Sequence, residues 1–278
     1  MKKIVLSDHT TSQLTVAQNE RQRHYHVKLF AYNEAIIQHD TRKAQARSEL
    51  INAWNQRKLG KILRAIFISV MRAYVTPKPP RPIMQGAGDQ EKIWNAGNEG
   101  EKKVETFLAK SLDDQWTLIN GYKNGKGEID QILVGPRGIF AIEIKYTNGT
   151  IYCDGDRWWR DKYDQYNNLV ETNKLIADKR GRSPSRQVND SSDMLQTFLQ
   201  KRYPSVRVYR SIIWAHERSV LGGINNLNVD YTAIVHDWNL DRFLGSSTYQ
   251  LSQEEQHKII ESIQRDHTYY NQPRKSKN

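Results

Sequence analysis

The spacing of apolar residues divides the chain into a helical part and a mixed part. From about residue 11 to residue 74 the sequence is rich in Gln, Arg, Ala, Glu and Leu, contains no proline, and has Gly60 as its only glycine. This composition favours long helix, and the glycine predicts a division into two helices. The stretch Thr76–Pro82 is rich in proline, which ends the helix and forms a stiff, extended spacer.

After the spacer, helical and strand-like spacing alternate. Apolar residues between Val104 and Leu112 recur at helical intervals, and the pair Ser183-Pro184 predicts a helix that runs to about Arg202. The segment 163–176 fits either helix or loop, and residues 252–255 form a capping box that opens a last helix. Strand-like runs lie at 116–122, 128–134, 139–146, 206–214 and 231–235, and a glycine-bearing turn at 154–156 predicts a shorter hairpin.

These patterns predict an α/β fold in four parts. A helical N-terminal region covers residues 1–76, and a proline-rich linker covers 77–96. An α/β domain follows at 97–215, and a C-terminal extension with a final helix and a basic tail occupies 216–278.

Composition narrows the expected partners and compartment. The net charge of +11 favours an anionic partner, either nucleic acid or an acidic membrane surface. The single cysteine, Cys153, excludes an intrachain disulfide and fits a reducing compartment. Only three apolar residues follow Lys2 and Lys3, and no apolar run is long enough to span a membrane. We therefore expect a cytoplasmic protein, with peripheral attachment to a membrane as an option.

The most informative segment is a predicted hairpin that carries two carboxylates. Two apolar strands flank the loop at residues 135–138, and pairing Val134 with Ile139 places Asp130 directly opposite Glu143. Alternation then puts Glu143 and Lys145 on one face of the strand.

Facing carboxylates repel each other, so this arrangement needs a compensating group. A divalent cation supplies one, because Mg²⁺ is held in proteins by one or two carboxylates and retains waters for substrate oxygens. Lys145 would then lie beside the metal, where it could orient or deprotonate a water or stabilise charge on a phosphate. The alternative is a solvent-facing strand with ordinary alternating charges.

Several short motifs, in order, resemble the NERD (nuclease-related) domain of the PD-(D/E)XK nuclease superfamily. They are Gly97-Asn98-Glu99-Gly100-Glu101, Glu128-Ile129-Asp130, Gly135-Pro136-Arg137-Gly138-Ile139-Phe140 and Ile142-Glu143-Ile144-Lys145. The resemblance implies a restriction-endonuclease-like core, in which a helix precedes a three-strand antiparallel meander, a second helix and a further strand. Ile129 stands where the superfamily name has proline.

The resemblance also implies roles for individual residues. Asp130 and Glu143 become ligands of Mg²⁺ or Mn²⁺, with the backbone carbonyl of Ile144 as a third ligand, and Lys145 becomes the catalytic lysine. The acid of the first helix falls on Glu101, and the Pro-x-x-Gln motif falls on Pro184-Ser185-Arg186-Gln187, which assigns Gln187 to the site.

Each supporting residue also has an ordinary structural explanation. With Asn98 as N-cap, Glu101 would complete a capping box, and Gln187 could bond the backbone at its helix end. Arg180, Arg182 and Arg186 could grip phosphate at that helix start or line a solvated loop. For Trp158, Trp159, Tyr163 and Tyr166, packing onto the sheet is favoured over stacking on bases.

The preferred function is metal-dependent hydrolysis of phosphodiester bonds in nucleic acid, with DNA favoured over RNA. The alternatives are a nucleic-acid-binding module that does not cut, and a scaffold or membrane-proximal protein that carries a nuclease-like domain. No pattern in the sequence sets the oligomeric state.

Residues 57–75 predict an amphipathic helix with an unbroken apolar stripe. Basic residues accompany the stripe, and no acid occurs between Arg57 and Pro82. Such a helix can lie on an anionic membrane surface, but packing on a partner helix, on the earlier helix or on the nuclease core is somewhat favoured. The stripe comprises Leu59, Ile62, Leu63, Ile66, Phe67, Val70, Met71 and Tyr74.

Overall fold

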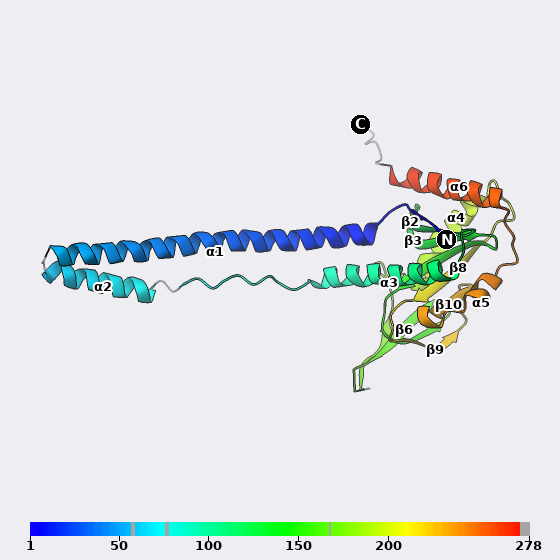
Figure 1. Ribbon diagram of the computed structural model, residues 1–278. Coiled ribbons are helices and arrows are strands. Elements are labelled where there is room, and N and C mark those ends of the chain that lie inside the picture. The colour runs from blue at the N-terminus through cyan, green and yellow to red at the C-terminus, as the bar shows by residue number, and fades with distance from the viewer. Residues whose placement is uncertain (57–58, 76–77, 167, 273–278) are drawn as a thin grey trace. The chain divides into compact units, whose positions relative to one another are not determined.

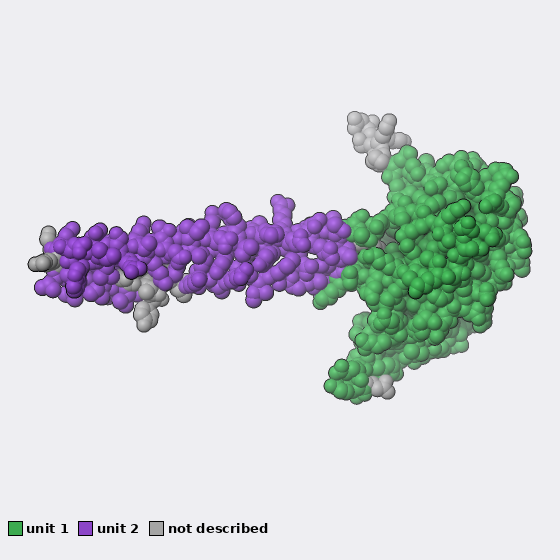
Figure 2. Space-filling model, in the orientation of Figure 1, with its two compact units in different colours: residues 1–13, 92–278 green, residues 14–91 purple. Residues whose placement is uncertain are grey.

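The computed structural model describes residues 1–56, 59–75, 78–166 and 168–272, and the side chains of residues 9, 10, 53, 69 and 71–75 lie outside the described set. The chain forms two compact units, which Figure 2 colours separately. A helical unit comprises residues 14–91, and an α/β unit comprises residues 1–13 and 92–278. Within the described ranges, none of the helices is both long enough and apolar enough to cross a membrane.

The helical unit contains two helices, as the composition predicts. Helix α1 spans His9–Asn55 and helix α2 spans Leu59–Val75 (Figure 1). Gly60 does not separate them, because it lies in the first turn of α2. The break precedes Leu59, and residues 57–58 of the predicted helix lie outside the described residues. Residues 76–77 of the predicted spacer also lie outside them, whereas residues 78–88 have no regular secondary structure.

A six-stranded mixed sheet forms the centre of the α/β unit, in the order β1-β2-β3-β4-β8-β10. Strands β2, β3 and β4 form an antiparallel meander, and the β4–β8 and β8–β10 pairs are parallel. Five of these strands match the predicted runs, whereas β1 was not predicted. Their bounds are β1 Lys2–Val5, β2 Thr117–Lys123, β3 Glu128–Gly135, β4 Gly138–Lys145, β8 Val208–Trp214 and β10 Tyr231–Ile234.

A second sheet has the order β7-β6-β5-β9. The predicted hairpin around residues 154–156 is confirmed as β5 (Gly149–Asp154) and β6 (Arg157–Tyr163). Segment 163–176, which fits helix or loop by its sequence, contains strand β7 (Leu169–Leu175) instead. Strand β7 is largely exposed and lacks alternating apolar residues, so its pairing with β6 rather than its own pattern defines it. Strand β9 spans Ser219–Asn225.

Helices cover both faces of the six-stranded sheet. Helix α3 (Asp89–Ser111) packs on one face through Val104 and Leu108, together with α5 (Leu240–Gly245). Helix α4 (Pro184–Gln200) and helix α6 (Gln253–Asn271) contribute to the core on the other face, which also includes Trp158 of the second sheet. The short 3-10 helix η1 spans Val235–Asp237. Ser183 caps α4 and Ser252 opens α6 with a capping box, as predicted.

The last 63 residues belong to the same compact unit as the predicted α/β domain, although the sequence pattern separates them as an extension at 216–278. Strand β10 completes the central sheet, and α6 lies against β2 and β3. The hydroxyl of Tyr122 donates to Asp266, and the backbone N–H of Lys123 donates to Nδ1 of His267 at 3.0 Å. These buried polar contacts hold α6 to the end of β2.

Candidate functional site

The candidate site lies where strands β3 and β4 part. The predicted register is present, since Val134 pairs with Ile139 and Gln131 pairs with Ile142. The ladder ends there, one position short of the predicted direct pairing between Asp130 and Glu143. Instead, Oδ2 of Asp130 accepts a hydrogen bond of 2.7 Å from the backbone N–H of Ile144. Two carboxylates at a paired position would repel each other, and the parting of the strands avoids that position.

Lys145 of β4 connects Glu143, on the same strand, to Gln187 of helix α4. Its Nζ donates to Oε1 of Glu143 at 2.5 Å and to Oε1 of Gln187 at 3.0 Å. The Glu143 side chain is buried, with 5% of its surface exposed, whereas 22% of the Lys145 side chain is accessible. The structure therefore brings the carboxylate, the lysine and the predicted glutamine together on the face that α4 covers.

The amide nitrogen of Gln187 is held by the backbone at the start of α4. Its Nε2 donates to the backbone carbonyls of Arg182 and Ser183 at 3.0 and 3.2 Å, which leaves Oε1 for Lys145. Ser183 begins α4 because its hydroxyl accepts the N–H of Arg186, and Pro184 occupies the first helical position. The predicted bonding of Gln187 to the backbone is therefore confirmed, its amide oxygen contacts Lys145, and its role in the site stays a prediction.

The charged groups of the site shift the pKa values of Asp130 and Lys145. Burial, followed by repulsion from Glu143, raises the pKa of Asp130 well above its usual range. Burial alone would lower the pKa of Lys145, but the carboxylates of Glu143 and Asp130 outweigh it and raise that pKa. Without a cation, the site thus favours protonated Asp130 and a charged Lys145.

Glu101 reaches the site from the opposite face of the sheet. It lies inside α3, which begins at Asp89, so the predicted capping box with Asn98 as N-cap is wrong. The charge of Glu101 contributes to the raised pKa of Asp130, and its backbone carbonyl accepts a 3.2 Å bond from Gln131. A Cβ at Gly100 would lie 3.3 Å from Cγ2 of Ile144, so a glycine at this position allows α3 to approach β4 closely.

The three arginines near the start of α4 differ in their contacts and in their exposure to solvent. Arg182 donates from Nε to Oδ2 of Asp178 at 2.9 Å and from Nη1 to the carbonyl of Lys126 at 3.3 Å. Arg180 and Arg186 are exposed, although Nε of Arg186 lies 3.9 Å from Oδ2 of Asp190. These two side chains are therefore better placed than Arg182 to contact a phosphate.

Asp178 belongs to the site although the sequence analysis does not select it. Its Oδ1 accepts the backbone N–H groups of Arg180 and Arg182, at 2.8 and 2.9 Å, which folds the loop before α4. Its charge also contributes to the raised pKa of Lys145. The sequence contains a pattern that could have identified Asp178, because an Asp followed three residues later by Gly is typical of a side-chain-capped turn. Gly181 has a φ of 77°.

Asp156 is a second residue that the sequence analysis passed over. Its Oδ1 accepts hydroxyl hydrogen bonds from Ser183 and Ser185, so the β5–β6 turn is tied to the first turn of α4. The indole of Trp158 donates to Ser185 at 2.8 Å and its ring packs against Trp214. Trp158 is fully buried, which confirms its predicted packing role.

The remaining aromatic residues of this region are less buried. The rings of Trp159 and Tyr152 stack with centroids 5.7 Å apart, which fits packing on the second sheet. The side chains of Tyr163 and Tyr166 are exposed.

The donor set of the site fits a divalent cation. Among the residues that the structure describes, no three His, Cys, Asp or Glu side chains gather closely enough to hold a metal ion. The pair Asp130 and Glu143 remains, and Mg²⁺ sites use one or two protein carboxylates together with waters. The pKa of Asp130 is raised by burial first and by repulsion from Glu143 second, and a bound cation would oppose both by favouring the ionised carboxylate.

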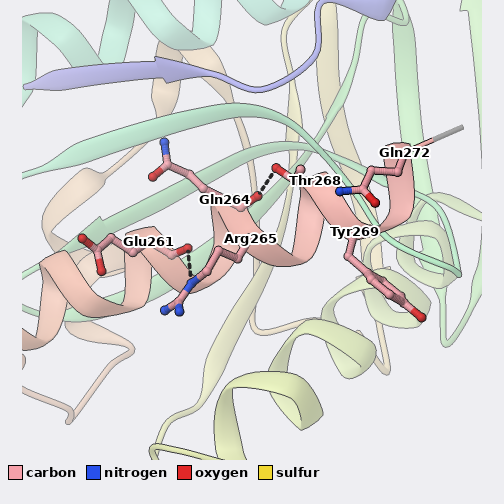
Figure 3. A pocket seen from close by; sticks show the side chains of 6 residues that line it. All are labelled: Glu261, Gln264, Arg265, Thr268, Tyr269 and Gln272. Carbon is pink, nitrogen blue, oxygen red and sulfur yellow. Dashed lines mark hydrogen bonds between the residues drawn. The ribbon is translucent and has the colours of Figure 1, made fainter.

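A separate surface groove lies along α6 and contains none of the candidate residues. Figure 3 shows its lining side chains, which come from α6 and from Gln272, the residue that caps its C-terminal end. Arg265 and Thr268 each bond a carbonyl four residues earlier, as helical surface residues commonly do. The groove is lined by Glu261, Gln264, Arg265, Thr268, Tyr269 and Gln272.

An α/β domain with carboxylates, a lysine and a glutamine at a parted hairpin fits the class of nuclease-like folds. Residues 96–215 match the family described as the nuclease-related domain, NERD. This segment is therefore similar to the nuclease-related domain, and placement in the PD-(D/E)XK superfamily is consistent with that family. The match suggests a nuclease-related function. Neither the curated proteins nor the solved structures contain a match to this chain.

Proposed function

We propose that this protein is a metal-dependent nuclease that hydrolyses phosphodiester bonds, with DNA as the expected substrate. The observation that carries the proposal is the position of Lys145, whose Nζ lies between Glu143 and Gln187 in the site that also contains Asp130. A binding surface for phosphate gains nothing from two inward-facing carboxylates, since they repel the ligand. A centre that activates water beside a phosphate requires them.

The carboxylates would hold the metal. Asp130 and Glu143 would bind Mg²⁺ or Mn²⁺, together with the backbone carbonyl of Ile144. When bound, such a cation lowers the pKa of a coordinated water and neutralises charge on the phosphate. Glu101 would support the centre from α3 through its charge.

Lys145 would act on the reacting oxygens. Its ammonium is within hydrogen-bond distance of Glu143 and Gln187, and it can donate to the attacking water or to a phosphate oxygen as charge develops there. Gln187 would position Lys145 without touching the substrate, because its own amide N–H groups are bonded to the backbone. Arg180 and Arg186, exposed at the start of α4, would contact neighbouring phosphates.

The test is a cleavage assay with purified full-length protein. Labelled plasmid, linear DNA and RNA are incubated with Mg²⁺, with Mn²⁺ or with EDTA, and binding is measured in parallel by gel shift. Cleavage of DNA that requires a divalent cation is the expected result. Binding without cleavage in either metal would contradict the proposal and favour a nucleic-acid-binding module. Preferential cleavage of RNA would correct the substrate only.

A further inference from the structure

Helix α2 leaves most of its described apolar side chains exposed. Leu59, Leu63 and Phe67 are 78%, 68% and 64% exposed, and their spacing of four residues places them along one side of the helix. Ala65 is buried and Ile62 is half-buried, so the rest of the helical unit covers only a narrow part of α2. We call the exposed set Leu59, Leu63, Ile66, Phe67 and Val70 the α2 surface.

A continuous exposed apolar surface of this kind requires a partner, because single exposed apolar residues are common but contiguous ones mark interaction sites. The packing favoured by the sequence pattern therefore accounts for only part of the stripe. Met71 and Tyr74 also belong to the predicted stripe, but their side chains lie outside the described set.

The charged residues of α2 itself are all basic. Lys61 and Arg64 are exposed beside the α2 surface, and α2 contains no acidic residue. The sequence from Arg57 to Pro82 also contains no Asp or Glu. An exposed apolar stripe on a helix whose own charged residues are all basic is typical of helices that lie on anionic lipid.

Helix α1 offers an informative contrast. Phe30 and Ile37 are 67% and 65% exposed, which is close to the exposure of Phe67 and Leu63. Exposed charges of both signs surround them, namely Lys28, Glu34 and Asp40. Mixed charges beside an apolar seam suit pairing with another helix, where opposite charges meet across the seam. Helix α2 contains no acidic residue that could contribute to such pairs.

We propose that α2 binds the surface of an anionic bilayer. The helix is about 25 Å long at 1.5 Å per residue, and it lies along the membrane with the α2 surface in the headgroup boundary. Lys61 and Arg64 contact the anionic headgroups. This proposal is independent of the proposed nuclease activity, since none of its residues belongs to the candidate site.

The experiment is co-sedimentation of the full-length protein with vesicles of phosphatidylcholine alone or of phosphatidylcholine with phosphatidylserine. The test variant is Leu63→Glu with Phe67→Glu, and the control variant is Phe30→Glu with Ile37→Glu on α1. Both variants replace two similarly exposed apolar residues and change the net charge equally, so a general loss of basic charge affects them alike. Circular dichroism checks that both variants retain their helix content.

Wild-type protein should sediment with the phosphatidylserine vesicles, remain in solution with phosphatidylcholine alone, and lose binding as salt rises. The test variant should partition roughly tenfold or more weakly, whereas the control should match the wild type. A second variant, Lys61→Gln with Arg64→Gln, keeps the apolar side chains and should lower both binding and its salt dependence. Equal binding by the test and control variants would overturn the proposal. So would a lipid-free oligomer that only the test variant dissociates, since the occupant would then be a second copy of the chain.

Discussion

The two units of this protein distribute polar and apolar groups in opposite ways. The α/β unit buries charged side chains, such as Glu143, and gives them specific partners, whereas the helical unit exposes large apolar side chains such as Leu63. Both arrangements cost free energy unless something offsets it. The comparison shows where to look for function: at the buried charge in one unit and at the uncovered apolar surface in the other.

The largest expected effect comes from the carboxylates. Asp130→Ala and Glu143→Ala should each lower cleavage by about a hundredfold or more while largely sparing nucleic-acid binding, because each removes a proposed metal ligand. Asp130→Ala should also raise the melting temperature of the metal-free protein by removing repulsion. The matched control is Glu34→Ala on α1, an exposed carboxylate of the helical unit. Cleavage at the wild-type rate by both site variants would refute the assignment.

A smaller effect is expected at the lysine. Lys145→Ala should lower kcat strongly with little change in metal affinity, on the order of a hundredfold if it donates to the developing charge. Lys145→Arg should restore activity only in part, because a planar guanidinium does not reproduce the compact ammonium between Glu143 and Gln187. Single-turnover cleavage and metal titration separate the two quantities, with Lys28→Ala as the exposed control. A defect confined to metal binding would assign the residue a different role.

The turn carboxylate of the α/β unit should affect stability rather than chemistry. Asp156→Ala removes the acceptor of the Ser183 and Ser185 hydroxyls, so we expect a loss of about 1 kcal/mol in the free energy of unfolding. Burial would raise the pKa of Asp156, but these hydroxyl hydrogen bonds outweigh it and lower the pKa. The contribution is therefore present above the unfolded pKa and disappears as the pH falls through the lower folded value. Urea unfolding at several pH values measures it, and an unchanged midpoint at neutral pH would show that the contact is dispensable.

The smallest effect is expected at the contact that holds α6. Burial raises the pKa of Asp266, so the folded state favours the protonated carboxyl group. The free energy of unfolding therefore falls as the pH rises from the unfolded pKa toward the higher folded pKa. Asp266→Asn retains an acceptor for Tyr122 and avoids that loss, so it should stabilise the protein at neutral pH by at most about 1 kcal/mol. The gain should vanish as the pH falls to the usual aspartate range. Asp40→Asn on α1 is the exposed control, and destabilisation at neutral pH would show that the ionised carboxylate is required.

The sequence was sufficient where local and tertiary signals agreed. The β3–β4 hairpin was predictable in element and register, because strong apolar alternation flanks a short turn. The start of α4 was predictable because Ser183 and Pro184 satisfy the first turn locally. The hairpin positions Lys145 and helix α4 positions Gln187. The proximity of these two residues was therefore predictable from the two elements together with the family resemblance.

The sequence was insufficient where distant partners decide the structure. Strand β1 has only four residues and exists through its pairing with β2, which no local pattern reveals. Asn98 was predicted to cap a helix start, yet α3 runs through it, and Gly100 is explained by the close approach to β4. The parting of β3 and β4 at Asp130 was also hidden, since it depends on a side chain that bonds the backbone of the opposite strand.

The hydrogen bonds of the Lys145 ammonium mean that this side chain loses its rotamer freedom when the protein folds, before any ligand binds. An ammonium group has three N–H donors, and among the described residues Glu143 and Gln187 receive two of them. A lysine on an exposed surface samples many rotamers and loses that freedom when it meets a ligand. Here the side chain is already ordered during folding, so an arriving oxygen meets one remaining donor with a set direction. The conformational entropy that the Lys145 side chain loses thus lowers the stability of the folded protein and does not lower its affinity for a substrate.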